Sequence, residues 1–458
     1  MTNPLQHLAI SLALVPFTIS AQTLGNVAIP GKNQWLFYGV EFSDASVQDK
    51  TAESVDLIAL VNAQLKDNGL GLVLALAPIK ARIYKQHLPD DKALTPYLDS
   101  NYKRMSQALQ TKGVATADIN TAFSDPAVAG DSGLYYRLDS HWSQRGALLA
   151  GETVKNEIAR RPELSAAIAG LPPLAMKLIE HKKTRPSKAR DLTQLMSADD
   201  AKKYESEPFL PIQFQRSGAA NSLTGNEEAP GIVLVGSSYS QEWTAFPDAM
   251  RFHLQKDIGN YSLDASIGQW VGFYRYLQSD AYHLSSPKLA IWEIPERDMV
   301  ATPDFKYREA RYQMHRTDWS MGVAAWAQRN CQPGQGSVKG LASGAKAAKT
   351  KDTAAIQISG APADTYIDIE VTNATKGTDY IDARLTSSAD QTVSIEVLAG
   401  KKRSLPTLKL AGDGQPHVLR IPLTSSDGQV TKARIALSGA ANVELANVRV
   451  CQHKPLPM

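Results

Sequence analysis

Cysteine is almost absent from this chain of 458 residues, which contains only two. Two cysteines exclude a disulfide-dense fold and a zinc site built of thiolates. The chain also lacks a large excess of charge of one sign, because it contains 49 basic and 46 acidic residues and its net charge is +3. So mild a balance gives no electrostatic argument for nucleic acid as a partner. The hydrophobic share of 43% excludes wholesale disorder and a polytopic membrane protein.

The N-terminus carries an uncharged apolar run at residues 8–21, LAISLALVPFTISA. It is too short for a membrane-spanning helix, which needs about 20 residues, but it is typical of the core of a secretion signal. An uncleaved anchor or a buried helix is the alternative, since no Lys or Arg precedes the run. We expect residues 1–21 to be a signal peptide, cleaved after Ala21.

The two cysteines are Cys331 and Cys451. In an exported protein they can form a disulfide, because an oxidising compartment preserves such a bond. The bond would close a loop of about 120 residues, for which chain entropy predicts a stabilisation of about 4–5 kcal/mol. Two unrelated buried thiols are the alternative.

Residues 22–325 show α/β patterning. Apolar runs of strand length recur and are typical of parallel sheets covered on both faces. They lie at 72–77 (LVLALA), 232–235 (IVLV) and 289–294 (LAIWEI). Residues 143–160 repeat apolar side chains at helical spacing, and Ser143 can cap that helix. The polar stretch 181–231 reads as an irregular insertion in this first domain.

The pattern changes after residues 332–353, whose Gly, Ala, Ser and Lys predict a linker or loop. Seven or eight short stretches with alternating apolar residues follow. Period-two stretches separated by turn residues predict an antiparallel β-sandwich. We therefore expect a second domain at residues 326–458.

Ser238 is a candidate nucleophile, because the buried strand at 232–235 runs directly into Gly236 and two serines. Ligands bind at the carboxyl ends of such strands, and a following helix start favours a developing oxyanion. A simple turn is the alternative.

Asp139 and His141 supply the base that a serine needs, since residues two apart in an extended segment project to one side. No HExxH motif occurs, and no further His or Cys stands at ligand spacing, so we expect no metal.

Six stretches occur in a characteristic order: residues 31–38 (GKNQWLFY), 77–80 (APIK), 88–89 (LP), 135–142 (YYRLDSHW), 236–240 (GSSYS) and 292–297 (WEIPER). Together they resemble the AlgX-like family of periplasmic alginate O-acetyltransferases, whose catalytic domain is similar to SGNH hydrolases. The resemblance implies a triad of Asp139, His141 and Ser238 in an SGNH-like parallel-sheet domain. The triad order, with serine last, looks like the circularly permuted topology of this family.

The resemblance also implies a periplasmic location, a C-terminal carbohydrate-binding module and no cofactor. The expected partners are an anionic polysaccharide, alginate, and other proteins of an alginate synthesis and export complex. A protein or a small molecule would supply the acetyl group. If water accepts the acetyl group in place of a sugar, the protein is a carbohydrate acetylesterase. If the triad is inactive, the protein is a polysaccharide-binding scaffold. Another exopolysaccharide, such as cellulose, is a third alternative.

Further residues are candidates for binding substrate. The backbone N–H groups of Ser238 and Gly268 are candidate oxyanion donors, although a plain turn at Gly268 is equally compatible. Tyr239 and Trp270 are expected to line the glycan groove unless they belong to the core. Arg297 can bind a uronate carboxylate or pair with Glu293 or Glu296.

The second domain holds the positive excess, because residues 321–458 carry sixteen basic against eleven acidic residues. This suits a polyanionic ligand. If the stretch is extended, Lys376, Thr378, Tyr380 and Arg384 share one face and can take a carboxylated sugar by charge-assisted bonds and stacking. The alternative is a solvated edge strand with Tyr380 in the core.

Overall fold

The computed structural model describes residues 25–456 except 126, 128–132, 217–229, 265–266, 306–311, 345–348, 351–353 and 364. The predicted signal peptide, residues 1–21, lies outside the described residues. No helix in the described part of the chain has the length and apolar composition that a membrane crossing requires.

A five-stranded parallel sheet forms the centre of the first part of the chain, in the order β10-β9-β11-β3-β4. Its strands are β3 (Gly71–Ala77), β4 (Ala115–Ala117), β9 (Ile232–Val235), β10 (Ile258–Asn260) and β11 (Leu289–Pro295). Every residue of β9 and β11 is buried, as continuous apolar strands require when both faces are covered. The three predicted apolar runs are therefore β3, β9 and β11.

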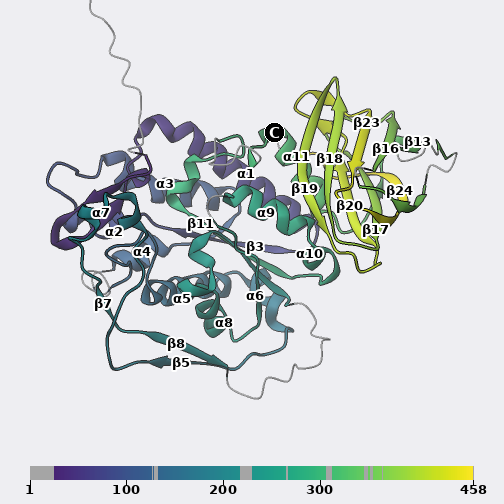
Figure 1. Ribbon diagram of the computed structural model, residues 1–458. Helices are drawn as coiled ribbons and strands as arrows, with labels where there is room; N and C mark the ends of the chain where they lie inside the picture. The colour runs from purple at the N-terminus through teal and green to yellow at the C-terminus, as the bar shows by residue number, and fades with distance from the viewer. Residues whose placement is uncertain are drawn as a thin grey trace, which may run out of the picture.

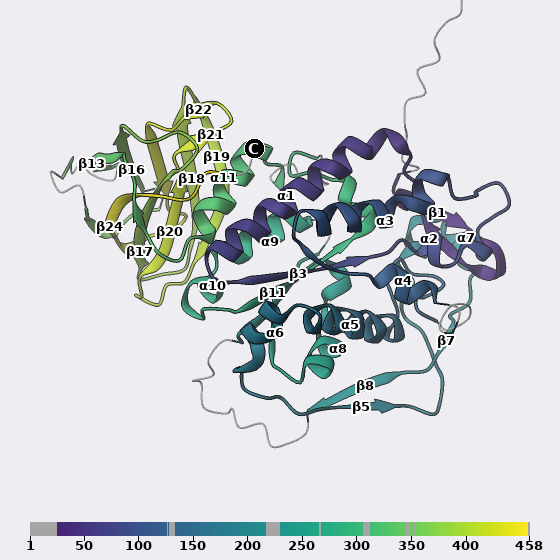
Figure 2. The same cartoon turned by 180° about the vertical axis from the view of Figure 1, so that it is seen from behind.

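Helices cover both faces of this sheet (Figures 1 and 2). One face packs against α1 (Gln48–Asp67), α3 (Pro96–Thr111), α9 (Gln269–Gln278) and α11 (Arg316–Ala327). The opposite face packs against α4 (Ile119–Ser124), α5 (Gln144–Ala159), α6 (Pro162–Ala169) and α8 (Phe246–Leu254). Helix α5 is the predicted one, and the Ser143 hydroxyl caps it by accepting from the backbone N–H groups of Arg145 and Gly146.

Short elements complete this part of the chain. Three short helices are α2 (Lys80–Ile83), α7 (Ala198–Ala201) and α10 (Asp280–Leu284). Three two-stranded antiparallel pairs are β1 (Ala28–Pro30) with β2 (Leu36–Tyr38), β5 (Met176–Glu180) with β8 (Ile212–Arg216), and β6 (Arg185–Pro186) with β7 (Pro208–Phe209). The predicted insertion at 181–231 thus holds β6, β7, β8 and α7, although residues 217–229 are outside the description.

Two antiparallel sheets form the C-terminal part. One contains β12 (Gln332–Pro333), β15 (Ile356–Ala361), β17 (Asp379–Ser387), β20 (His417–Pro422) and β24 (Ala441–Gln452). The other contains β13 (Ser337–Ser343), β14 (Lys349–Thr350), β16 (Tyr366–Thr372), β18 (Gln391–Ala399), β19 (Lys401–Leu410) and β23 (Lys432–Ala436). A short hairpin, β21 (Thr424–Ser425) with β22 (Gly428–Gln429), follows β20. Apolar side chains of both sheets share one core, which makes them a sandwich.

One prediction for this region is wrong. The described residues of the predicted linker at 332–353 mostly form strands, because β12, β13 and β14 lie there and β13 pairs with β16 over six residue pairs. The stretch lacked a continuous apolar face, yet β13 buries Leu341 and Ser343. Backbone pairing within a sheet needs no apolar face, so composition alone missed the strand.

The two parts are joined at α11. The Arg420 guanidinium donates to Asp382 at 3.1 Å and to the carbonyl oxygens of Ala325 and Trp326 at the end of α11. Cys331 and Cys451 form the predicted disulfide, which ties the segment after α11 to β24. The domain boundary at residues 325–326 stays a prediction, since a shared core crosses it.

Candidate active site

Ser238 lies where β9 ends, in a tight turn that begins a short 3₁₀ helix. The turn needs glycine at position 236, because a Cβ there would come within 2.5 Å of the Ser240 hydroxyl and 2.7 Å of Glu293. Glu293, on the neighbouring strand β11, accepts from the backbone N–H of Ser237 at 2.8 Å and from the Ser240 hydroxyl at 3.0 Å. This buried carboxyl therefore fixes the turn that presents Ser238.

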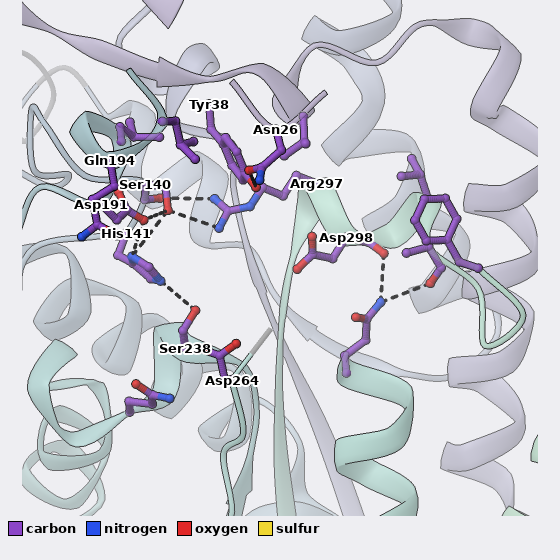
Figure 3. Close-up of a pocket in the computed structure, with 18 of the residues that line it drawn as sticks. Asn26, Tyr38, Ser140, His141, Asp191, Gln194, Ser238, Asp264, Arg297 and Asp298 are labelled. Carbon is purple, nitrogen blue, oxygen red and sulfur yellow. Dashed lines mark hydrogen bonds and ion pairs between the residues drawn. The ribbon is translucent and has the colours of Figure 1, made fainter. Parts of the chain in front are cut away.

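His141 reaches the Ser238 hydroxyl although 97 positions separate the two residues. Its Nε2 lies 2.7 Å from Ser238 Oγ (Figure 3). Its Nδ1 lies 2.7 Å from Oδ1 of Asp139. Asp139 and His141 are in the loop before α5, and all three side chains are buried. An imidazole between a carboxylate and a hydroxyl can take the hydroxyl proton while the carboxylate fixes its tautomer.

The ionised form of Asp139 is stabilised in this site. Burial by itself would raise the pKa of Asp139, but the hydrogen bond and charge of His141 lower it below its ordinary value, helped by the backbone N–H of Asp191. That N–H donates to Oδ2 at 2.9 Å, and the backbone N–H of His141 donates to Oδ1 at 3.1 Å. Asp139 is therefore held as a carboxylate at neutral pH.

Lys80 ties the loop of Asp139 to the rest of the fold. Its ammonium has no exposed surface and donates to three carbonyl oxygens, those of Leu36 at 2.6 Å, Arg137 at 2.8 Å and Asp139 at 3.0 Å. Burial lowers the pKa of Lys80 to about 8, against the opposing charges of Glu41 and three further carboxylates. One buried side chain thus ties its own segment to two stretches that are distant in sequence, that of Leu36 and that of Arg137 and Asp139.

A cavity of about 650 Å³ opens beside Ser238 and His141. Arg297 lines it and donates to the Ser140 carbonyl at 3.2 Å (Figure 3). It also donates to the Tyr239 hydroxyl at 2.8 Å. Its carboxylate neighbour is Glu41 at 3.7 Å, so the predicted pairing with Glu293 or Glu296 is wrong. Glu296 pairs with Arg82 instead.

The family model described as "SGNH hydrolase-like domain, acetyltransferase AlgX" matches residues 28–296, which is more than half of the chain. The chain belongs to this family. It is therefore an enzyme of the acetyltransferase class, and the predicted family membership is confirmed.

Two relatives illustrate the similarity. The probable alginate O-acetylase AlgJ of Pseudomonas putida is 28% identical over 278 residues, which cover 58% of this chain and 69% of that protein. The AlgJ protein of Pseudomonas aeruginosa is 27% identical over 324 residues, which cover 67% of this chain and 79% of that protein.

Two solved structures share the fold. The O-acetyltransferase domain of Pseudomonas putida AlgJ superposes with a TM-score of 0.52 at 26% identity and covers 60% of this chain and 93% of that one. Pseudomonas aeruginosa AlgX superposes with a TM-score of 0.59 at 15% identity, over 93% of this chain and 94% of that one. The predicted SGNH-like domain followed by antiparallel sheets is thereby confirmed.

Asp191 is a site residue that the sequence did not reveal. Its carboxylate accepts from the Ser140 backbone N–H at 2.7 Å and from the Ser140 hydroxyl at 2.6 Å, and Oδ2 lies 3.5 Å from Nδ1 of His141. Burial, followed by the charge of Asp139, raises the pKa of Asp191. It belongs to the polar insertion, about fifty positions from His141, and no local pattern marks it.

Asp139, His141 and Asp191 place potential metal-ligand atoms within 4.8 Å of one another. All four carboxylate oxygens of the two aspartates already accept hydrogen bonds from the protein. A cation would have to displace these bonds, so we assign no metal to the group.

Two aromatic residues predicted to line the groove are buried instead. Trp270 has no exposed surface and packs edge-on against Trp292 and Trp319, so it belongs to the core. Tyr239 is 1% exposed, and its ring centroid lies 4.7 Å from that of His141. Tyr239 therefore packs against the imidazole rather than facing a ligand.

Gly268 precedes α9 with φ 82°, a conformation that glycine adopts without strain. The residue is buried, and its neighbour Gln269 lines the cavity. The proposed donation from its backbone N–H stays a prediction.

The predicted sugar-binding face on the sandwich, formed by Lys376, Thr378, Tyr380 and Arg384, does not form as expected. Lys376 and Thr378 lie in a turn, because β17 begins only at Asp379, so the stretch is not extended across the set. Tyr380 has no exposed surface and packs with Ala325 and the disulfide. A buried ring cannot stack on a sugar, so the prediction that Tyr380 binds a sugar is wrong. Lys376 is exposed and Arg384 is partly exposed, and their roles stay predictions.

Replacing Glu293 by glutamine is expected to change the pH dependence of stability. Burial raises the pKa of Glu293 from 4.5 to about 7, against hydrogen bonds from Ser237 and Ser240. Between these values the folded chain binds one proton more than the unfolded chain. The stabilisation is therefore complete below pH 4.5 and is lost as pH rises through 7, about 3 kcal/mol in all.

Urea unfolding at pH 4.5 and pH 8 measures this. The wild type is expected to lose that much more stability than Glu293→Gln over this range. The control Glu370→Gln, at an exposed position on β16, should follow the wild type. Equal losses in the wild type and Glu293→Gln would contradict the assignment.

Proposed function

We propose that this protein transfers acetyl groups to hydroxyl groups of alginate, with Ser238 as nucleophile, His141 as general base and acid, and Asp139 as the residue that orients His141. The observation that carries the proposal is the continuous chain of contacts, 2.7 Å on each side of the imidazole. The substrate follows from relatives named alginate O-acetylases, which match this chain at 27–28% identity.

In the first half of the reaction, His141 takes the proton of Ser238 as Oγ attacks the carbonyl carbon of an acetyl ester or thioester. The tetrahedral intermediate carries its negative charge on the former carbonyl oxygen. The backbone N–H of Ser238 has no acceptor within the described residues, so it is available to that oxygen. The bond to the donor's oxygen or sulfur then breaks, and His141 returns the proton to this leaving group.

In the second half, a sugar hydroxyl gives its proton to His141 and attacks the acetyl group on Ser238. The bond between Oγ and the acetyl carbon breaks, and the same proton returns to Oγ. The products are an acetylated sugar and the free serine. A protein or a small molecule in the periplasm serves as donor, and other alginate biosynthesis proteins are the expected partners.

An acetyl-ester donor, with and without a mannuronate oligomer, tests the proposal. We expect mass spectrometry to detect acetylated oligomer, and the oligomer to divert acetyl groups from release as acetate. Acetate release that ignores the oligomer, with no acetylated glycan, would instead identify an esterase. No reaction with any donor, together with tight oligomer binding, would indicate a scaffold.

A further inference from the structure

A second cavity of about 510 Å³ lies next to the one that contains Ser238. Four residues border both cavities: His141, Asp191, Gln194 and Trp243. The two hollows therefore meet at the imidazole of the proposed triad. The catalytic scheme above assigns no ligand to the second cavity.

A strongly basic segment forms one wall of the second cavity. Residues 182–190 contain five cationic residues and no acidic one: Lys182, Lys183, Arg185, Lys188 and Arg190. Arg185, Lys188 and Arg190 line the cavity directly. The domain as a whole is close to neutral, so this local concentration of charge is not a consequence of its overall composition.

Two of these cations are free to bind a ligand. Arg190 is engaged, because its guanidinium donates to the carbonyl oxygens of Ala201 and Tyr204. Arg185 and Lys188 are exposed, and their side chains have neither a hydrogen-bond nor an ion-pair partner in the described part of the chain. Unpaired cations at the rim of a cavity are suited to carboxylate groups.

The backbone that carries these cations is fixed in place. Arg185 belongs to β6, which pairs with β7, and the backbone N–H of Ser187 donates to the Glu207 carbonyl at 2.8 Å. Ser187 is buried between the two exposed cations. The positions from which both charges extend are therefore preorganised, which lowers the entropic cost of binding.

An exposed aromatic ring stands between the two cavities. Trp243 is 48% exposed, and its ring meets His141 edge-on with the centroids 5.0 Å apart. Its indole N–H donates to the side chain of Gln241 at 2.8 Å, which holds the ring in place. An exposed, oriented tryptophan beside a base offers an apolar face to a sugar ring.

We propose that the second cavity is the subsite for the uronate units that flank the reacting sugar, with Arg185 and Lys188 binding their carboxylates and Trp243 contacting a sugar ring. The proposal rests on the proposed function for its choice of ligand. It places the glycan beside β6 and β7, at the end of the molecule away from the sandwich (Figure 1). Recognition of the glycan would then depend on the insertion rather than on Lys376.

Binding of a mannuronate oligomer to the Ser238→Ala protein tests the subsite without turnover. Adding Arg185→Glu and Lys188→Glu should weaken binding at least about tenfold, since two attractions become repulsions. The double change Lys66→Glu and Lys103→Glu alters net charge equally at exposed positions on α1 and α3 and should leave binding within about twofold. Circular dichroism verifies that each variant is folded.

Unchanged binding in the Arg185/Lys188 variant, or no binding by Ser238→Ala itself, overturns the subsite. Equal losses in both double variants would reveal a general charge effect and overturn it too. If a single-stranded oligonucleotide binds the cavity more tightly than the oligomer, the ligand class is wrong. Failure of acetyl transfer with selective oligomer binding intact would refute the proposed function and leave the subsite standing.

Discussion

Ser238→Ala is expected to lower acetyl transfer by about 10⁴- to 10⁶-fold, the range seen when one member of a serine triad is removed. The alanine leaves the His141–Asp139 contact intact but removes the oxygen that would carry the acetyl group. Because the proposed nucleophile and base act as one unit, His141→Ala should cost about as much, and the double variant should be no worse than either. Additive losses would contradict the coupling.

Intact-protein mass spectrometry separates this role from a structural one. Incubation with an acetyl-ester donor should produce an acetyl adduct on the peptide that contains Ser238. Ser262→Ala is a suitable control, because that hydroxyl donates to the Ser240 carbonyl at 3.0 Å and, within the described residues, bonds to neither Ser238 nor His141. An adduct that persists in Ser238→Ala at another residue would disprove the assignment of the nucleophile.

Lys80→Met is expected to destabilise the fold by about 3–5 kcal/mol, because three buried hydrogen bonds from a charged donor are lost. Methionine has a similar length but no donor, so the carbonyl oxygens of Leu36, Arg137 and Asp139 would lose their shared ammonium. Since unsatisfied buried carbonyls are costly, the loop that contains Asp139 and His141 should shift.

The activity of Lys80→Met should fall as well, by about 10²-fold, because a displacement of about 1 Å at a catalytic group costs that much. Lys85→Met, at an exposed lysine nearby, should match the wild type in both measurements. Urea unfolding gives the stability, and transfer assays at a temperature where the variant is folded give the activity. A variant as stable as Lys85→Met would show that Lys80 does not hold the loop.

Local patterns predicted much of the fold. The runs that became β3, β9 and β11 were recognisable because strands covered on both faces are apolar without alternation. The helix after Ser143 and the alternating strands of the sandwich follow from equally local rules. The contact of His141 with Ser238 was expected from the family resemblance and not from spacing, since 97 residues separate them.

The net charge of the first domain did not reveal the basic segment that lines the second cavity. Summed over the whole first domain, the charges nearly cancel, and the sequence pointed to the sandwich as the basic part. The five cations of residues 182–190 are concentrated within nine positions beside the active site. Charge acts on a ligand over about a Debye length, so the local count matters more than the domain total.

By itself, the sequence determined the parallel sheet, the sandwich and the neighbouring pair Asp139 and His141, because each depends on periodicity or on spacing along the chain. Only the tertiary structure decided which side chains face solvent and which distant groups meet. Tyr380 is buried because α11 and the disulfide cover its strand, and Asp191 reaches His141 because an insertion folds back. Whether a side chain is buried depends on which distant segments pack against it. The pattern of residues along the chain does not contain that information.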